Sequence, residues 1–173
     1  MFTRNVAVSV LLALSINAQV AGQGFKLQTV LNSAKCLTAS SLKNGAAVVI
    51  ENCGTNATTL NTWFSTPLGP TGFAKALSAG GFSSCLDVTD GPSGVAADGT
   101  KLQMWACSTT VIDGAQEFIF AEGSTLEWGG GIVVDGIKVC VDVTDGVTTN
   151  GNQLQIWECA GNNSNQKFNM IPV

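Results

Sequence analysis

One segment of this chain occurs twice with nearly the same sequence. Residues 85–107 begin Cys-Leu-Asp-Val-Thr-Asp-Gly and end Leu-Gln-Met-Trp-Ala-Cys, and residues 140–159 begin Cys-Val-Asp-Val-Thr-Asp-Gly and end Leu-Gln-Ile-Trp-Glu-Cys. An earlier segment, residues 36–53, also starts and ends with cysteine but lacks the aspartate, the glutamine and the tryptophan. Self-similarity at a period of about 50 residues indicates one supersecondary unit used three times. Function is therefore expected in the residues that the two complete copies share.

The first 22 residues have the features of a secretory signal peptide. Arg4 precedes an apolar run at residues 6–16, and small residues allow cleavage after Gly22 or, alternatively, after Ala18. The run is too short to span a bilayer, and no later stretch is continuously apolar for about 18 residues. We therefore expect a secreted, extracellular protein without membrane insertion, with residues 23–173 forming one domain.

Six cysteines in a secreted chain indicate disulfides rather than metal ligands. Each copy of the repeat has one cysteine at its start and one at its end, and this pattern selects one of the many possible connectivities. The predicted pairs are Cys36–Cys53, Cys85–Cys107 and Cys140–Cys159. The chain has no histidine and no cysteines at the close spacing that zinc sites use, so we expect neither a metal nor a cofactor.

The charge of the chain excludes two classes of partner. The whole chain has a formal net charge of −4, and removal of Arg4 with the signal segment makes it −5. The remaining lysines are scattered singly along the sequence. Nucleic acids and anionic membranes bind clustered lysines and arginines, so we expect no nucleic-acid partner.

Short apolar or alternating runs bounded by Gly, Asn, Asp or Ser are typical of β-strands. Such runs occur at residues 46–50, 101–105, 131–134 and 153–157. No long stretch after the signal segment has helical periodicity, and twenty glycines are spread through the chain. We therefore predict an all-β sandwich or barrel, and the three copies favour a threefold barrel.

An aromatic residue follows the closing cysteine of each copy at a similar distance. Gln-Glu-Phe ends at Phe118 and Gln-Lys-Phe ends at Phe168, while the first copy reads Asn-Thr-Trp-Phe and ends at Phe64. We predict that these three phenylalanines are core residues, one per repeat. Trp63 and Trp128 have two open interpretations: each either covers an apolar patch or widens a binding surface.

The Cys-x-Asp-Val opening, the Leu-Gln-x-Trp-x-Cys strand and the trailing Gln-x-Phe occur in a fixed order. Together they resemble the ricin B-type lectin family of β-trefoils, over residues 25–173. The resemblance implies twelve strands, arranged as a six-stranded barrel capped by three hairpins, with one shallow sugar pocket per repeat. It also implies glycans or glycoproteins as partners, with galactose-type residues as the leading sugar class. The expected repeats are residues 25–75, 76–128 and 129–173, approximately.

Sugar recognition needs a hydrogen-bond acceptor for neighbouring hydroxyls and a flat apolar face for the C–H side of the ring. The resemblance implies that Asp142 accepts hydrogen bonds from vicinal hydroxyls and that Trp157 stacks on the sugar. By the same resemblance, Asn165 adds a polar contact and Gln166 supports the aspartate carboxylate. Gln155 lines or supports this pocket.

The second copy keeps four of these five positions. They are Asp87, Gln103, Trp105 and Gln116. This copy has Ala115 where the third has Asn165, and its loop at residues 92–99 is three residues longer, so we expect weaker binding there. The first copy has Thr38 in place of the aspartate and Val-Ile-Glu at residues 49–51 in place of Gln-x-Trp. We expect no sugar site in the first copy.

Each of these residue types also has a structural explanation. An aspartate before a turn stabilises hairpins, and a tryptophan beside a disulfide is often core packing. A purely structural pair would be needed in all three copies, whereas the first copy lacks both residues. The Asp-x-x-Asp-Gly sequence resembles part of a calcium loop but lacks its further carboxylates, so we interpret it as a turn.

Non-catalytic carbohydrate binding is the leading function class. The chain has no histidine, no tyrosine and no nucleophile elbow, and Asp87 and Asp142 belong to different copies, so we do not expect an enzyme. A secreted β-trefoil protease inhibitor or defence protein acting through surface loops is the alternative. Asn56 and Asn162 begin N-glycosylation sequons, whose occupancy the sequence leaves open.

Overall fold

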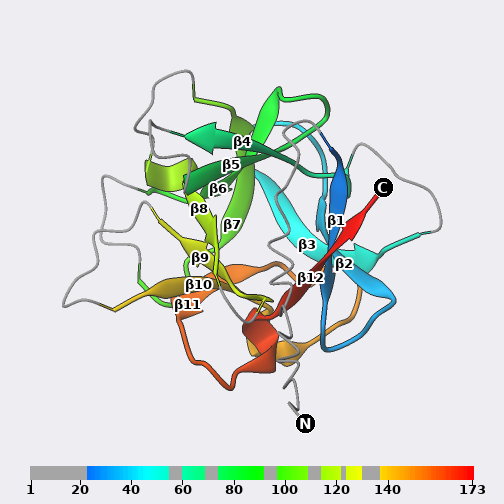
Figure 1. Ribbon diagram of the computed structural model, residues 1–173, viewed down its shortest axis with the longest axis vertical. Helices are drawn as coiled ribbons and strands as arrows, with labels where there is room; N and C mark the ends of the chain where they lie inside the picture. The colour runs from blue at the N-terminus through cyan, green and yellow to red at the C-terminus, as the bar shows by residue number, and fades with distance from the viewer. Residues whose placement is uncertain are drawn as a thin grey trace, which may run out of the picture.

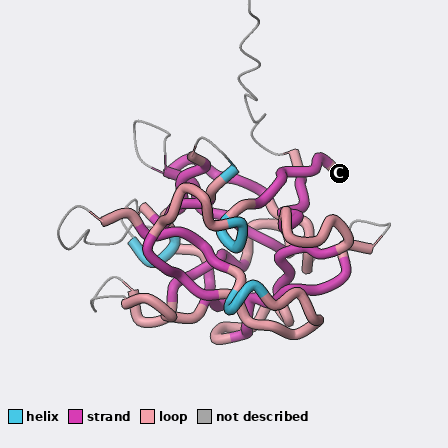
Figure 2. The backbone as a smooth tube through the Cα atoms, turned by 90° about the horizontal axis from the view of Figure 1, so that it is seen from below, coloured by secondary structure: helices cyan, strands magenta, loops and turns pink. Residues whose placement is uncertain are grey.

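The computed structural model describes residues 23–54, 60–68, 74–91, 97–108, 114–121, 124–129 and 137–173. These residues form β-strands joined by turns, with short 3₁₀ helices between some of them (Figure 1, Figure 2). The strands are β1 Phe25–Thr29, β2 Lys35–Ala39, β3 Ala46–Asn52, β4 Phe64–Leu68, β5 Ala74–Ala79, β6 Ser84–Val88, β7 Leu102–Ala106, β8 Phe118–Phe120, β9 Leu126–Trp128, β10 Val139–Asp142, β11 Gln155–Glu158 and β12 Phe168–Pro172. The 3₁₀ helices are η1 Gly114–Gln116, η4 Thr144–Gly146 and η5 Ser164–Gln166.

Six of the strands close into a ring. Antiparallel pairing joins β12 to β1, β4 to β5, β5 to β8, and β8 to β9. The two remaining joints are single bridges, Phe25 with Trp63 and Thr125 with Lys167. The first bridge connects β1 to the start of β4, and the second connects the start of β9 to the start of β12. These contacts make a closed six-stranded barrel.

The other six strands form three hairpins, β2–β3, β6–β7 and β10–β11, which also contact one another in a ring. In each hairpin turn a glycine with positive φ donates its N–H to a carbonyl in the second strand of the next hairpin. The three bonds are Gly45 to Met104, Gly99 to Ile156 and Gly151 to Ile50, each 2.9 Å. A six-stranded barrel with three capping hairpins, four strands to each repeat, is a β-trefoil, as the sequence predicts.

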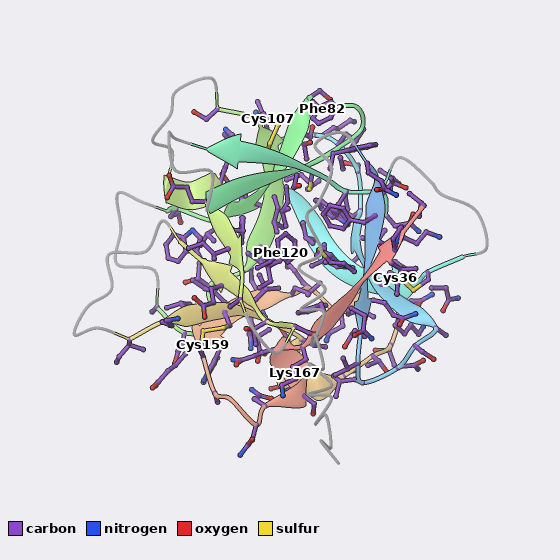
Figure 3. The ribbon with its side chains drawn as sticks, viewed as in Figure 1. Cys36, Phe82, Cys107, Phe120, Cys159 and Lys167 are labelled. Atoms are coloured by element: carbon purple, nitrogen blue, oxygen red, sulfur yellow. A yellow bond between two sulfur atoms is a disulfide. The ribbon has the colours of Figure 1, made fainter. Side chains whose placement is uncertain are left out.

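The three predicted disulfides are all present, one in each repeat. Their Cα atoms are 4.8, 4.9 and 5.1 Å apart, from the first repeat to the third. Figure 3 shows Cys36, Cys107 and Cys159 in three separate sectors around the centre of the molecule. Each bridge ties the opening strand of a hairpin to the residue that follows its closing strand.

The core aromatic of the first repeat is Trp63, not the predicted Phe64. Phe118 and Phe168 are buried in the main core cluster together with Trp63, whereas Phe64 is only half-buried and packs against Phe82 with ring centroids 5.1 Å apart. In the other two repeats the core phenylalanine lies two residues after a glutamine. Asn61 takes the place of that glutamine in the first repeat, so the core position is Trp63, one residue before the predicted Phe64.

The two unassigned tryptophans are structural. Trp63 is fully buried and Trp128 is nearly so, which excludes a role in widening a binding surface. Each indole N–H donates to a backbone carbonyl, Trp63 to Leu37 at 3.0 Å and Trp128 to Gly114 at 2.7 Å. A buried indole needs such a partner, so both positions are satisfied core sites.

Three of the four predicted strand segments lie on observed strands. Residues 46–50 are part of β3, residues 101–105 overlap β7, and residues 153–157 overlap β11. The fourth, residues 131–134, and the predicted signal peptide, residues 1–22, lie outside the described residues. No helix in the described part of the chain is long and apolar enough to cross a membrane.

Candidate functional site

The third-repeat hairpin brings the predicted aspartate, glutamine and tryptophan to one face. Asp142, at the end of β10, pairs with Gln155 in the first position of β11, and Cys140 pairs with Trp157. Side chains of directly paired residues lie on the same side of a sheet, and so do residues two apart along one strand. Asp142, Gln155 and Trp157 therefore share a face. Asp142 and Gln155 are buried, whereas 44% of Trp157 is exposed.

The Asp142 carboxylate is held by neutral amide donors. Gln155 Nε2 donates to Oδ1 at 3.2 Å, and Asn163 Nδ2 donates to Oδ2 at 3.3 Å. A further hydrogen bond comes from Gln166. A carboxylate has about four lone-pair positions, so this arrangement fixes its orientation while retaining capacity for a ligand hydroxyl.

Burial raises the pKa of Asp142 above its ordinary value of 3.8. The hydrogen bonds from Gln155, Gln166 and Asn163 act in the opposite direction because they stabilise the charged form, and the negative charge of Asp145 adds to the increase. The site therefore combines a poorly hydrated acceptor with an exposed aromatic face.

Gln166 connects this carboxylate to the end of β11. Its Oε1 accepts from the Ala160 backbone N–H at 2.9 Å, and its Nε2 donates to the Glu158 carbonyl at 2.9 Å. Gln116 makes the matching bonds in the second repeat, with the Ser108 N–H at 2.9 Å and the Ala106 carbonyl at 3.1 Å. The two glutamines thus link each aspartate carboxylate to the strand that carries the tryptophan of its repeat.

Asn163 is a site residue that the sequence did not identify. Its side chain contacts Asp142, and its Oδ1 accepts from the Asn165 backbone N–H at 3.0 Å. The predicted Asn165 lies beside it, half-buried, with its side chain against Gly146. Three asparagines occur within residues 162–165, and sequence alone gives no means of choosing among them.

The second repeat repeats this arrangement. Asp87 pairs with Gln103, and Cys85 pairs with Trp105. Gln103 Nε2 donates to Asp87 Oδ1 at 2.8 Å, and Gln116 Nε2 donates to Oδ2 at 3.2 Å. Trp105 is 44% exposed, the same fraction as its counterpart in the third repeat.

A pocket of about 290 Å³ lies over these residues in the second repeat. It is lined by Asp87, Thr89, Asp90, Gly91, Gln103, Trp105 and Ala115. Ala115 contributes only a methyl group where the third repeat has an asparagine. Residues 92–96 of the longer loop lie outside the described residues.

The first repeat has the same hairpin without these side chains. Thr38 pairs with Val49, and Cys36 pairs with Glu51, so valine and glutamate stand in the positions of the glutamine and tryptophan. The Thr38 hydroxyl donates to the carbonyl of Cys36 at 3.1 Å, within its own strand. This hairpin presents neither a carboxylate with amide donors nor an exposed aromatic face.

The Asp-Gly dipeptides are turns. Asp90 and Asp145 both have positive φ, 57° and 55°, and the N–H groups of Gly91 and Gly146 bond back to the carbonyls three residues earlier. Within the described ranges, no three His, Cys, Asp or Glu side chains come together in a way that could hold a metal ion.

Lys101, from the second repeat, reaches the third-repeat site. It lies just before β7 and its backbone forms an isolated bridge with Gln155. Its Nζ donates to Gln155 Oε1 at 3.1 Å and to Thr144 Oγ1 at 2.9 Å. Nothing in the repeat pattern indicates this contact, since it joins residues 54 positions apart in different copies.

Comparison with known proteins places the chain in a family. The profile of the ricin-type β-trefoil lectin domain matches residues 23–168. The comparison with curated proteins found no match. Among solved structures, the chain resembles the designed threefold-symmetric protein ThreeFoil, with 18% identity and a TM-score of 0.68 over 87% of this chain and 99% of that one.

Two natural lectins are also similar in structure. The C-half of the earthworm R-type lectin, solved in complex with GalNAc, is 14% identical with a TM-score of 0.62, over 87% of this chain and 99% of that one. The Macrolepiota procera ricin B-like lectin, solved in complex with lactose, is 18% identical with a TM-score of 0.60, over 88% and 96%. The TM-scores support the fold, and the profile match shows the family. The chain belongs to the ricin-type β-trefoil lectin family, whose domains generally bind carbohydrate without catalysis.

Proposed function

We propose that the protein is a secreted lectin that binds glycans bearing galactose-type residues, principally through the third-repeat site and more weakly through the second. The observation that carries this proposal is the same Asp, Gln and Trp arrangement in two repeats, at the same strand register, with all three residues replaced in the first. A role in folding alone would be needed in all three hairpins.

The arrangement suits a pyranose ring. One carboxylate accepts hydrogen bonds from neighbouring hydroxyls, and charge-assisted bonds of this kind are stronger than neutral ones. The exposed indole of Trp157 offers a flat face to the C–H side of the ring, and a shallow contact of this size gives a dissociation constant near millimolar, about 4 kcal/mol. Three disulfides are consistent with an extracellular location.

The two sites differ in their polar contacts. Asp142 receives a hydrogen bond from Asn163, and Asn165 lies beside it, whereas the second pocket has the methyl group of Ala115 on this side. A polar group that meets a ligand hydroxyl adds affinity of about 1 kcal/mol. This difference supports the third repeat as the stronger site.

A glycan array tests the proposal. The native chain is compared with the double variant Asp87→Ala/Asp142→Ala, whose fold is checked by circular dichroism. Binding of native protein to galactose-terminated glycans, lost in the double variant, is the expected result. Binding to glycans of a different terminal sugar would refute the galactose assignment, and binding that survives in the double variant would refute both sites.

A further inference from the structure

We infer that Lys101 is a positioning residue of the third-repeat site, so that a functional lectin pocket in this protein is built by two repeats rather than one. This inference rests on the proposed glycan-binding function of that site. Lys101 acts through Gln155 on the orientation of the Asp142 carboxylate. It is a structural difference between the two sites, in addition to the asparagines of the third repeat, because Lys101 stands opposite Gln155 whereas Ala47 stands opposite Gln103.

The position of Lys101 follows from the ring of hairpins. The N–H of Gly99 donates to the Ile156 carbonyl at 2.9 Å, and the N–H of Ile156 donates to the Thr100 carbonyl at 2.8 Å. The second-repeat backbone therefore runs beside β11, and Lys101 stands directly opposite Gln155. Directly paired side chains share one face of the sheet, so the lysine points toward the base of the third-repeat pocket.

The lysine and the carboxylate favour the same orientation of the Gln155 amide. A side-chain amide has a donor end and an acceptor end, and an ammonium group can only donate. Lys101 Nζ therefore requires the Oε1 end of Gln155, at 3.1 Å, which directs Nε2 toward Asp142 Oδ1, at 3.2 Å. The reversed amide would face the carboxylate with its oxygen and the ammonium with its N–H groups.

Thr144 fixes the other side of the lysine. Its hydroxyl hydrogen is directed to the Gln153 carbonyl at 2.6 Å, so its oxygen is left to accept from Lys101 Nζ at 2.9 Å. The equivalent Thr89 in the second repeat bonds to the Lys101 carbonyl at 2.8 Å in the same manner. Lys101 therefore donates to both Thr144 and Gln155, and Gln155 in turn donates to Asp142.

The other two repeats provide an internal comparison. The position equivalent to Lys101 is Ala47 in the first repeat, which pairs with Gln103 of the second-repeat site. A methyl group there cannot bond to the Gln103 Oε1. In the third repeat the equivalent position is Gln153, which faces Val49 of the first-repeat hairpin. Of the three hairpins, only the third-repeat site combines the glutamine with a lysine from its neighbour.

The test isolates the third-repeat site in an Asp87→Ala background and measures binding to lactose, N-acetyl-D-lactosamine and GalNAc. The variants are Lys101→Met, which keeps the aliphatic stem, Gln155→Ala, and the two combined. Lys138→Met is the matched control, because Lys138 is exposed and its ammonium group pairs with Glu127, outside the hydrogen-bond network of Asp142. The unfolding free energy of every variant is measured in parallel.

We expect Lys101→Met to weaken binding about tenfold, the effect of one charge-assisted hydrogen bond, and to have no further effect once Gln155 is alanine. Lys138→Met binds as the parent does. An equal loss in the presence and absence of Gln155, or no loss at all, overturns the inference while the parent still binds. A parent that binds none of the three sugars overturns the proposed galactose-type function and this inference with it.

A gain-of-function variant provides a second, independent readout. Ala47→Lys in an Asp142→Ala background places an ammonium opposite Gln103, where Thr89 corresponds to Thr144. We expect the affinity of the second-repeat site for the same sugars to rise severalfold. Lys101→Met should leave that site unchanged. Unchanged or weaker binding in a folded Ala47→Lys variant would contradict the inference that a lysine opposite the site glutamine strengthens binding.

Discussion

Trp157 lies directly opposite Cys140 in the β10–β11 pair, so the exposed indole and the third disulfide share one face of the hairpin. Trp105 has the same relation to Cys85 in the second repeat. The bridge therefore holds the strand that carries the aspartate against the strand that carries the stacking face. We therefore predict that stability and glycan binding are coupled at this point in the second and third repeats.

Removal of the third disulfide should affect both properties. The double variant Cys140→Ser/Cys159→Ser is expected to lose about 2–5 kcal/mol of unfolding free energy and to bind glycans more weakly. Cys36→Ser/Cys53→Ser is the matched control, with a similar loss of stability but nearly native binding at temperatures where it stays folded. Chemical denaturation and glycan titration provide the two measurements. Equal weakening of binding by both variants would contradict the proposed coupling.

Asp142→Ala should remove most of the binding. The change deletes the hydroxyl acceptor and leaves the amides of Gln155 and Asn163 without their partner. Thr38→Ala, at the equivalent position of the first repeat, should bind as the native protein does. Titration calorimetry with lactose makes the comparison, with circular dichroism as the check on folding. Native affinity in a folded Asp142→Ala protein is incompatible with the assigned site.

Asp87→Ala should reduce agglutination more than it reduces binding of a single sugar. The second and third hairpins lie in different sectors of the molecule, so one small glycan cannot bridge their pockets (Figure 1). A multivalent surface engages both and gains about 10²- to 10⁴-fold in avidity. Agglutination of glycoprotein-coated beads at limiting protein measures this gain. Unchanged agglutination would show that the second pocket does not bind.

Glycan binding through the third-repeat site should weaken on acidification at a pH above that expected for an exposed aspartate. Burial raises the pKa of Asp142 above 3.8, and only the ionised carboxylate has the full acceptor capacity that the site needs. An NMR titration of the Asp142 carboxyl carbon, compared with lactose affinity over the same pH series, tests this. A binding midpoint at or below 3.8 would contradict it.

Acid is expected to weaken glycan binding, but protonation of Asp142 stabilises the folded state. A carboxyl whose pKa is higher in the folded state binds its proton more tightly there, so protonation favours folding. The contribution of Asp142 to the unfolding free energy is therefore fully present below the unfolded-state pKa and is lost as the pH rises through the folded-state pKa. Loss of binding in acid is thus not a consequence of unfolding driven by this residue.

Much of the fold was predictable because its signals are local or repeated. The cysteine pairs follow from the repeat pattern, and the strands at β3, β7 and β11 follow from short apolar or alternating runs. The error at Phe64 has a simple cause. Two adjacent aromatic residues occur in the first repeat, and the burial of Trp63 together with the hydrogen bond of Asn61 to the Cys53 carbonyl shows which of them occupies the core position.

The contacts that were missed depend on geometry that a repeat pattern does not encode. Asn163 contacts Asp142 because of its position at the start of η5, where its side chain also accepts from the Asn165 N–H. Lys101 reaches Gln155 because the hairpin turns interlock between repeats. Alignment of the copies compares each repeat with the others, and it therefore cannot reveal what one repeat supplies to the next.

The interlocked glycine turns also determine how the protein can come apart. In a linear array of repeats the end units touch one neighbour and can unfold first, whereas here Gly45, Gly99 and Gly151 link the three units head to tail in a circle. Opening any one unit breaks contacts with both others. The first repeat lacks the aspartate and the exposed tryptophan of the other two, but its hairpin bonds to both of theirs, so its deletion would remove contacts that support both of the other hairpins.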